Sequence, residues 1–224
     1  MKVYLVRHGE SKLNAKRIHQ NAKSELSELG VKQAEFVAKR FIRIPVDVIV
    51  ASPFTRAKQT AEIINSVLKK PIKFTSLLAE QKRPTVIEGL HYDDPAVIEI
   101  HKLIKVNWHN PAWRHSDEET FFDLKERAEK VIENVLELKK ENVLLVTHGD
   151  IMGMIFLILA QKDKLEPNDY WRFRTFLAIN NTGITLYEYK NEKWKDVQFL
   201  AGFVVQIISS GSETVLNEMY TTIH

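Results

Sequence analysis

Arginine and histidine side chains follow three short apolar runs of this sequence, each within a few residues of the end of its run. They are Arg7, His8 and Gly9 after the first run, Arg56 after the second, and His148 and Gly149 after the third. Guanidinium groups hold the oxygens of a tetrahedral anion two at a time, and a neutral imidazole can act as a nucleophile or carry a proton. Brought together, these groups would bind and transform a phosphate-like anion.

Each of these residues also has a simpler interpretation when it is considered alone. Arg7 and His8 would be a basic pair at a loop edge, and Arg56 a solvated charge near the start of a helix. His148 would be a hydrogen-bonded structural histidine. The anion site is favoured because similar groups follow three runs, and such a cationic cluster repels itself unless an anion lies within it. Helices that begin after the second and third runs would add N-terminal N–H groups, which favour phosphate.

The elements that would position these residues are alternating strands and helices. Predicted strands cover Lys2–Val6, Val46–Ala51, Val143–Thr147 and Ile184–Tyr189. Predicted helices cover residues 27–41 with Ser27 as N-cap, Thr55–Leu68, Phe121–Leu138 and Asp150–Leu159. This order indicates an α/β fold, a three-layer α/β/α sandwich around a mostly parallel central sheet. Ligands of such sheets bind beyond the carboxyl ends of the strands, which is where the three runs end.

The regular pattern is interrupted between about residues 80 and 117, where prolines, two tryptophans and four histidines occur. This segment is predicted to be a cap of loops and helix, inserted into a single domain that spans residues 1–200. Residues 201–224 form a C-terminal extension to which the sequence assigns no function. It contains an edge strand, Phe203–Ile208, with a short helix, or it provides a contact in a homodimer, and both interpretations are left open.

The composition favours a small phosphorylated substrate as the partner. The 224 residues include 32 Lys and Arg and 29 Asp and Glu, which gives a net charge of +3. Because this small excess is not accompanied by a long basic run, nucleic acid is not the expected partner. The absence of cysteine excludes disulfides and thiolate chemistry and fits a reducing compartment. No signal peptide is recognisable, and the apolar stretch Ile151–Ala160 is too short for a membrane span. We therefore expect a cytoplasmic protein that does not bind membranes.

Four segments, in this order and spacing, resemble the histidine phosphatase superfamily, whose fold is described as phosphoglycerate mutase-like. They are LVRHGES, LSELGVKQA, SPFTRAKQTAEII and VTHG. The resemblance extends from about Lys2 to Tyr189. It implies the same sandwich fold with its cap, and an enzyme that needs neither metal nor cofactor because arginines supply the positive charge.

The resemblance also implies a role for each matching residue. His8 would be the nucleophile that becomes a phosphohistidine, and Glu80, within the segment LLAE, the general acid that protonates the leaving group. The residues that would hold the phosphoryl group are Arg7, Asn14, Arg56, His148 and Gly149. A surface carboxylate is the alternative interpretation of Glu80.

Two departures from the mutase pattern favour a phosphatase. Gln20 is followed by Asn21 where mutases carry glycine, and Glu80 is followed by QKRPTVIEG instead of the segment that holds a bisphosphate. Arg83 in this stretch is a candidate contact for the distal part of a substrate. A phosphoglycerate or sugar-phosphate mutase remains the alternative enzyme, and a catalytically weak module that binds a phosphorylated ligand is the alternative outside enzymes.

Other features of the cap are interpreted as structural. The four cap histidines match no compact metal motif, although nearby carboxylates leave a metal site open. These histidines are His91, His101, His109 and His115, and the carboxylates are Asp93, Asp94 and Asp117. Trp108 and Trp113 could stack on a substrate ring, but packing within the cap is favoured.

Overall fold

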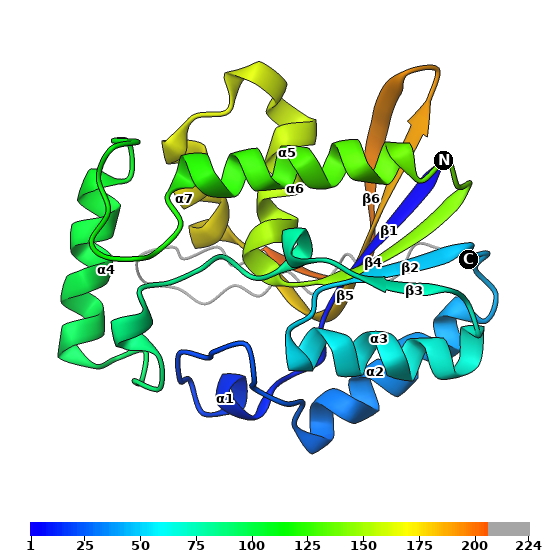
Figure 1. The fold of residues 1–224 in the computed structure, drawn as a ribbon, viewed down its shortest axis with the longest axis horizontal. Helices are drawn as coiled ribbons and strands as arrows, with labels where there is room; N and C mark the ends of the chain where they lie inside the picture. Colours follow the sequence, from blue (N-terminus) through cyan, green and yellow to red (C-terminus); the bar gives the residue numbers. More distant parts are fainter. Residues whose placement is uncertain (206–224) are drawn as a thin grey trace.

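A six-stranded mixed sheet forms the centre of the molecule (Figure 1). The computed structural model describes residues 1–205, without the side chains of residues 163, 176–178 and 196–205. The strands are β1 (Lys2–Arg7), β2 (Val48–Ala51), β3 (Ile72–Phe74), β4 (Asn142–Thr147), β5 (Leu177–Lys190) and β6 (Lys193–Val205). The α-helices are α1 (Lys12–Ala15), α2 (Glu28–Phe41), α3 (Thr55–Leu68), α4 (Pro95–Asn107), α5 (Phe121–Glu137), α6 (Gly149–Gln161) and α7 (Pro167–Phe176). Short 3₁₀ turns cover Ser76–Leu78, Thr85–Ile87 and Lys162–Lys164.

The strand order β3-β2-β4-β1-β5-β6 places the three predicted strand ends side by side. Strands β3, β2, β4 and β1 are parallel to one another, whereas β5 pairs antiparallel with both β1 and β6. This confirms the predicted mostly parallel sheet. Helices begin immediately after β2 and β4, as expected, so the N-termini of α3 and α6 lie at the same edge of the sheet.

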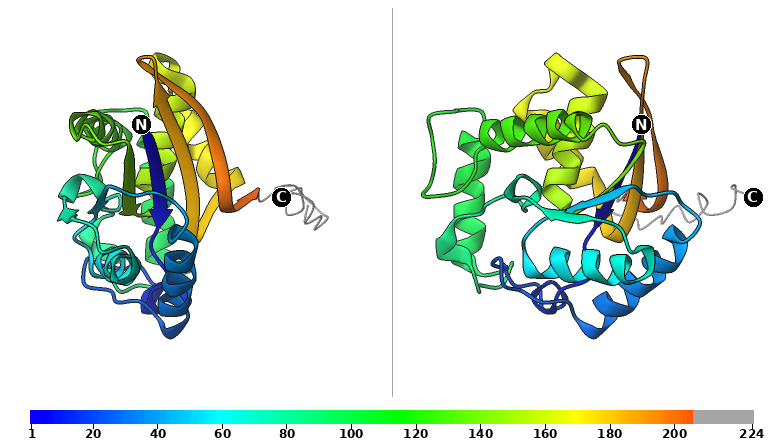
Figure 2. Two further views of the ribbon diagram at one scale, coloured as in Figure 1. Left: turned by 90° about the vertical axis from the view of Figure 1, so that its right-hand side faces the viewer. Right: turned by 45° about the vertical axis from the view of Figure 1, so that its right-hand side comes forward.

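Helices cover both faces of the sheet (Figure 2). Consecutive residues of β1 point to opposite faces: Tyr4 and Val6 belong to the core under α2 and α3, and Val3 and Leu5 to the core under α5 and α6. Both faces are therefore apolar, which explains why the strands are continuously hydrophobic rather than alternating. The three-layer sandwich is confirmed.

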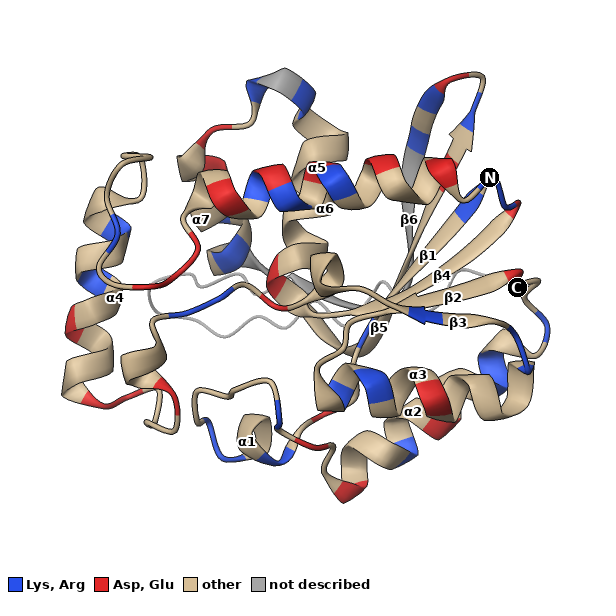
Figure 3. Ribbon diagram, in the orientation of Figure 1, with Lys and Arg blue, Asp and Glu red and all other residues tan. Residues whose placement is uncertain are grey.

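The outer face of α5 shows why this long helix was recognisable from its pattern. Leu124 and Val131 are buried on one side. Acidic and basic residues alternate along the exposed side (Figure 3), with an ion pair between Glu126 and Lys130 one turn apart.

Some predicted boundaries were wrong at the C-terminal half of the sheet. β5 begins at Leu177 rather than Ile184, and the edge strand is Lys193–Val205 rather than Phe203–Ile208, of which 206–208 lie outside the described residues. The start of β6 was not recognised because it is charged, and an edge strand of a hairpin needs no continuous apolar run. β3 was missed because it has only three residues. The short helix and the dimer contact proposed for the extension also lie outside the described residues.

The cap segment contains α4, which stands at the side of the molecule beside the carboxyl ends of the strands (Figures 1 and 2). Asp94 caps this helix by accepting a hydrogen bond from the Ala96 N–H. Trp108, at its end, is stacked on Tyr170 of α7 with ring centroids 5.8 Å apart and is only 5 % exposed, so it packs in the core as favoured from the sequence. The domain limits at residues 80, 117 and 200 stay predictions, although β6 continues past residue 200 to Val205.

The LSELGVKQA segment is the N-terminus of α2, and it holds the loop that follows β1. The N–H of Ser27 donates to the Glu10 carbonyl over 2.9 Å, and its hydroxyl donates to the Glu10 carboxylate over 2.7 Å. Gln33 accepts a hydrogen bond from the Glu10 N–H over 2.8 Å. Gly30 lies so close to this loop that a Cβ at that position would be 1.9 Å from the Glu10 carbonyl oxygen.

We expect Gly30→Ala to destabilise the protein even though alanine is the better helix former. Relief of a backbone clash costs about 3 kcal/mol, which outweighs the gain of about 1 kcal/mol in helix propensity. Urea unfolding followed by circular dichroism measures the difference. Lys32→Ala, on the exposed side of the same helix, is the matched control and should be nearly neutral. Equal stability of the two variants would contradict the close contact.

Candidate active site

The register of the sheet brings the three strand ends to one place. Arg7 of β1 lies opposite Thr147 of β4, so that His8 and His148 occupy equivalent positions on adjacent strands. Their ring centroids are 5.0 Å apart. Ser52 follows β2, and its N–H donates to the Val146 carbonyl over 3.0 Å.

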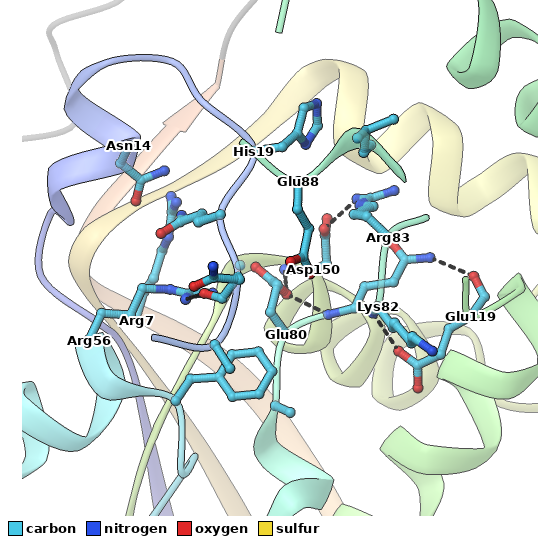
Figure 4. A pocket seen from close by; sticks show the side chains of 18 of the residues that line it. Arg7, Asn14, His19, Arg56, Glu80, Lys82, Arg83, Glu88, Glu119 and Asp150 are labelled. Atoms are coloured by element: carbon cyan, nitrogen blue, oxygen red, sulfur yellow. Dashed lines mark hydrogen bonds and ion pairs between the residues drawn. The ribbon is translucent and has the colours of Figure 1, made fainter. Parts of the chain in front are cut away.

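A cavity of about 840 Å³ opens at this edge of the sheet, and it is lined by basic, acidic and imidazole side chains (Figure 4). Its wall includes the predicted residues Arg7, Asn14, Arg56, Glu80 and Gly149. His8 and His148 are 1 % and 0 % exposed, and Arg56 of the wall donates a hydrogen bond to His8. The structure thus brings together every site residue predicted from the sequence.

His8 has the geometry of a neutral imidazole with one unprotonated nitrogen. Its Nδ1 lies 2.6 Å from the carbonyl oxygen of Gly9, to which it donates its proton. Its Nε2 accepts a hydrogen bond from Arg56 Nε over 3.2 Å. Burial, followed by the charges of Arg56 and Arg7, holds the pKa of His8 well below its usual range. Nε2 therefore carries no proton at neutral pH, and its lone pair accepts the Arg56 hydrogen bond.

The two arginines are fixed by backbone carbonyls, which leaves other donors for a ligand. Arg7 Nη1 donates to the Ile179 carbonyl of β5, and among the described residues its buried Nε has no partner. Arg56 Nη1 donates to the Asn21 carbonyl over 3.0 Å. Burial lowers the pKa of Arg56 to about 10, so it remains a cation at neutral pH. Gly149 lies beside Arg7, where a Cβ would be 3.6 Å from Nε.

His148 is hydrogen-bonded through one of its two ring nitrogens. Its Nε2 lies 2.8 Å from Ser52 Oγ, which also accepts a hydrogen bond from the Phe54 N–H over 3.2 Å. Its Nδ1 is buried and has no partner among the described residues. Burial, then Arg56, lowers the pKa of His148 well below its usual range.

Glu80 is a half-buried carboxyl group in the cavity wall rather than an exposed surface carboxylate. One of its oxygens, Oε1, accepts the N–H groups of Gln81 and Asp150, each over 3.0 Å. Burial, followed by the negative charge of Asp150, raises the pKa of Glu80. The described residues give its second oxygen, Oε2, no hydrogen bond, so a proton on Oε2 can be donated into the cavity.

The segment that carries Glu80 is held from two sides. The Thr147 hydroxyl at the end of β4 donates to the Leu78 carbonyl over 2.6 Å. From α5, Arg127 donates to the carbonyls of Leu77 and Ala79 over 2.8 and 2.7 Å and pairs with Glu119. These contacts connect the general-acid candidate rigidly to the strand that carries His148.

Several cavity residues were not predicted from the sequence. Asp150, at the start of α6, pairs with Arg83 and with Arg174 of α7. His19 and His101 also line the cavity, with ring centroids 5.2 Å apart, and burial lowers the pKa of each to about 4. The sequence interpretation had treated His101 as a structural cap residue. Of these residues, only Asp150 could have been found from the sequence, because it directly follows the VTHG motif. A carboxylate next to an anion site needs cationic partners of its own.

The cap histidines do not gather around a metal. Within residues 1–205, no group of three or more His, Asp or Glu side chains is placed to hold a metal ion. Arg83 lines the cavity, and its predicted contact with the distal part of a substrate stays a prediction.

Comparison with known proteins identifies the class to which this fold and site belong. The model of the histidine phosphatase superfamily, branch 1, matches residues 3–200. The chain belongs to this superfamily, as its motifs indicated, and is therefore an enzyme of this phosphatase class.

Relatives within the superfamily bear two kinds of name. A protein of Hydrogenobacter thermophilus named "Putative phosphoserine phosphatase 2" is 30% identical over 195 residues, which cover 86% of this chain and 91% of that protein. "Probable phosphoglycerate mutase GpmB" of Proteus mirabilis is 28% identical over 208 residues, 87% of each chain. A structure described as a putative alpha-ribazole-5'-P phosphatase of Escherichia coli has the same fold, with a TM-score of 0.74 and 20% identity over 89% of this chain and 95% of that one.

In the described part of the chain, no helix is both long and apolar enough to cross a membrane. The most apolar helix, α6, is buried between the sheet, α5 and α7.

Proposed function

We propose that this enzyme is a metal-independent phosphatase that hydrolyses a phosphate monoester through a phosphohistidine on His8, with Glu80 as general acid. One observation carries the proposal: a neutral imidazole with an unprotonated Nε2 is in contact with Arg56, at a cavity lined by Arg7, Arg56 and a carboxyl group with a raised pKa. This arrangement supplies a nucleophile, an anion clamp and a proton donor.

In the first half-reaction, a phosphoryl group takes the place of His8 Nε2 as the partner of Arg56 Nε. The guanidinium groups of Arg7 and Arg56 and the imidazole of His148 hold its oxygens, where the transition state concentrates negative charge. Nε2 of His8 then attacks phosphorus as the bond to the leaving oxygen breaks, and Glu80 Oε2 gives its proton to that oxygen. The products are an alcohol, the phosphohistidine and the Glu80 carboxylate.

In the second half-reaction, the Glu80 carboxylate takes a proton from a water molecule whose oxygen attacks phosphorus. The bond between phosphorus and Nε2 breaks, and its electron pair returns to the imidazole. Inorganic phosphate leaves, and both His8 and Glu80 recover their starting protonation states. The backbone contact of Nδ1 with Gly9 keeps the ring oriented in both steps.

A mutase is the second candidate, because relatives named as phosphoglycerate mutases match most of the chain. In a mutase, the phosphohistidine returns its phosphoryl group to the bound product instead of to water. The sequence departures after Gln20 and after Glu80 favour the phosphatase.

The absence of cysteine supports a reducing, cytoplasmic setting for the enzyme.

The test is the incubation of the protein with phosphoserine, 3-phosphoglycerate, glycerol 2-phosphate and p-nitrophenyl phosphate in an excess of chelator. We expect inorganic phosphate in stoichiometric yield with the released alcohol from at least one alkyl ester. Isomerised 3-phosphoglycerate with little free phosphate would instead assign the mutase. Loss of activity with chelator would contradict a metal-independent reaction, and failure with every ester would favour the module that only binds phosphorylated ligands.

A further inference from the structure

Two carboxyl groups lie next to each other in the cavity wall, in opposite surroundings (Figure 4). Each oxygen of Asp150 has its own guanidinium partner, since Oδ2 pairs with Arg83 and Oδ1 with Arg174 Nε over 3.1 Å. Glu80 forms no ion pair among the described residues and accepts only backbone N–H groups. One carboxyl group is thus built to be ionised, and its neighbour to keep a proton.

A hydrogen bond from the backbone of Asp150 connects it to the side chain of Glu80. The backbone N–H of Asp150 donates to Oε1 of Glu80, over 3.0 Å. Asp150 is the second residue of α6, so this N–H belongs to the free N-terminal turn of the helix. Because Oε1 also accepts the Gln81 N–H, the orientation of the carboxyl group is fixed and Oε2 faces the cavity.

We propose that Asp150 is the positioning residue of the general acid: it orients Glu80 through its backbone N–H and keeps the proton on Glu80 through the negative charge that Arg83 and Arg174 hold in place. This inference rests on the proposed function, because it requires Glu80 to donate a proton. In this role Asp150 acts through Glu80 and needs no contact with the phosphoryl group or the leaving oxygen.

The charges around the pair support this division. Burial alone would raise the pKa of Asp150, but Arg174 and Arg83 hold it well below its usual range. Burial and the Asp150 charge raise the pKa of Glu80, against the opposing charges of Arg56 and Arg7. When environments move the pKa values of two adjacent carboxyls apart, the pair acquires separate roles.

Residues from every surrounding element face this pair. They are Arg7 of β1, Arg56 of α3, Arg83 and Gln81 of the segment after Glu80, His101 of α4, Arg127 of α5, and Tyr170 and Arg174 of α7. His101 is uncharged at neutral pH, since its pKa is lowered to about 4. Tyr170 is uncharged because burial raises its pKa. Besides burial, the charges that act on the pKa of Glu80 are therefore those of Asp150 and the arginines.

A purely structural role for Asp150 makes a different prediction. Asp150 joins α6 to α7 and to the segment after Glu80, so its loss could simply loosen the cavity. Such loosening lowers activity equally at every pH and for every leaving group. A positioning role changes the pH at which activity is lost, and only for esters whose leaving group needs a proton.

The decisive variant is Asp150→Asn, which keeps the backbone N–H and the side-chain shape but removes the charge. The negative charge that raises the pKa of Glu80 is then lost while Arg56 and Arg7 still lower it, so the pKa of Glu80 falls. We expect the basic limb of kcat/KM for the best alkyl ester of the panel to move about one pH unit lower. With p-nitrophenyl phosphate, whose leaving group departs without a proton, no such displacement is expected.

Arg174→Gln provides a test of opposite sign and a second route if Asp150→Asn does not fold. It removes one partner of Asp150, so the carboxylate acts more strongly on Glu80 and the basic limb moves to higher pH. Circular dichroism and the melting temperature establish that each variant is folded. Basic limbs that stay in place, or move in the same direction in both folded variants, would overturn the proposal.

Failure of this inference can be told apart from failure of the proposed function. If Glu80→Gln hydrolyses alkyl esters as fast as the wild type, Glu80 is not the acid and the proposed function itself is wrong on this point. If Glu80→Gln is impaired but both basic limbs are unmoved, only the role of Asp150 is refuted.

Discussion

His8→Ala should abolish phosphate release from every ester and leave no phosphorylated protein behind. Removal of the attacking nitrogen eliminates both half-reactions, and losses on removal of a covalent nucleophile reach at least about 10⁴-fold in kcat. Binding should survive, because Arg7, Arg56 and His148 remain. Rapid acid-free quenching followed by intact-mass measurement, at alkaline pH where phosphohistidine persists, detects the intermediate in the wild type and its loss in the variant.

The matched control for this experiment is His109→Ala, because His109 is an exposed histidine outside the cavity wall. It should retain both activity and the phosphorylated intermediate. Phosphate release by His8→Ala at a rate near that of the wild type would refute the covalent route and would indicate direct attack by water.

Glu80→Gln should slow alkyl esters far more than aryl esters with a good leaving group. Loss of a general acid costs about 10²–10⁴-fold when the leaving oxygen must be protonated, whereas p-nitrophenolate leaves without a proton. Steady-state kcat for the best alkyl ester and for p-nitrophenyl phosphate, measured in the wild type and the variant, gives this ratio. A uniform loss across leaving groups would indicate a positional role for Glu80.

The pH dependence of the wild type should show the same division. Glu80 must be protonated, and its pKa is raised, so kcat/KM for alkyl esters falls only as the pH rises through that raised value. His8 must be neutral, and its pKa lies well below the usual range, so the acidic limb falls far below pH 6.5. Glu80→Gln should remove the basic limb and leave the acidic one.

The part of the site that lies at strand ends could be predicted from sequence, because it obeys two simple physical rules. Apolar runs identify buried parallel strands, and the carboxyl ends of parallel strands meet at one edge of a sheet. Arg7, His8, Arg56 and His148 are each adjacent to such an end, so their convergence needed no knowledge of the tertiary structure.

The rest of the site depends on contacts between segments that have no local pattern. Arg83 and Asp150 are 67 positions apart in the chain, and Arg174 comes from α7, which the sequence reading did not recognise as a helix. His19 and His101 meet because α4 is placed beside the first loop. Side-chain pairing across a cavity is decided by the whole fold, which explains why hydrophobic periodicity located α5 accurately but not these partners.

Arg56 donates a hydrogen bond to Nε2 of His8, the nitrogen that would attack phosphorus. Nε2 is therefore covered by the guanidinium of Arg56 until an anion binds to that guanidinium in its place. Substrate binding and activation of the nucleophile then occur together. A phosphoryl group that binds Arg56 exposes Nε2 of His8, whereas a neutral ester in the cavity leaves this nitrogen covered. Arg56 thus binds the substrate and also prevents His8 from reacting with uncharged esters.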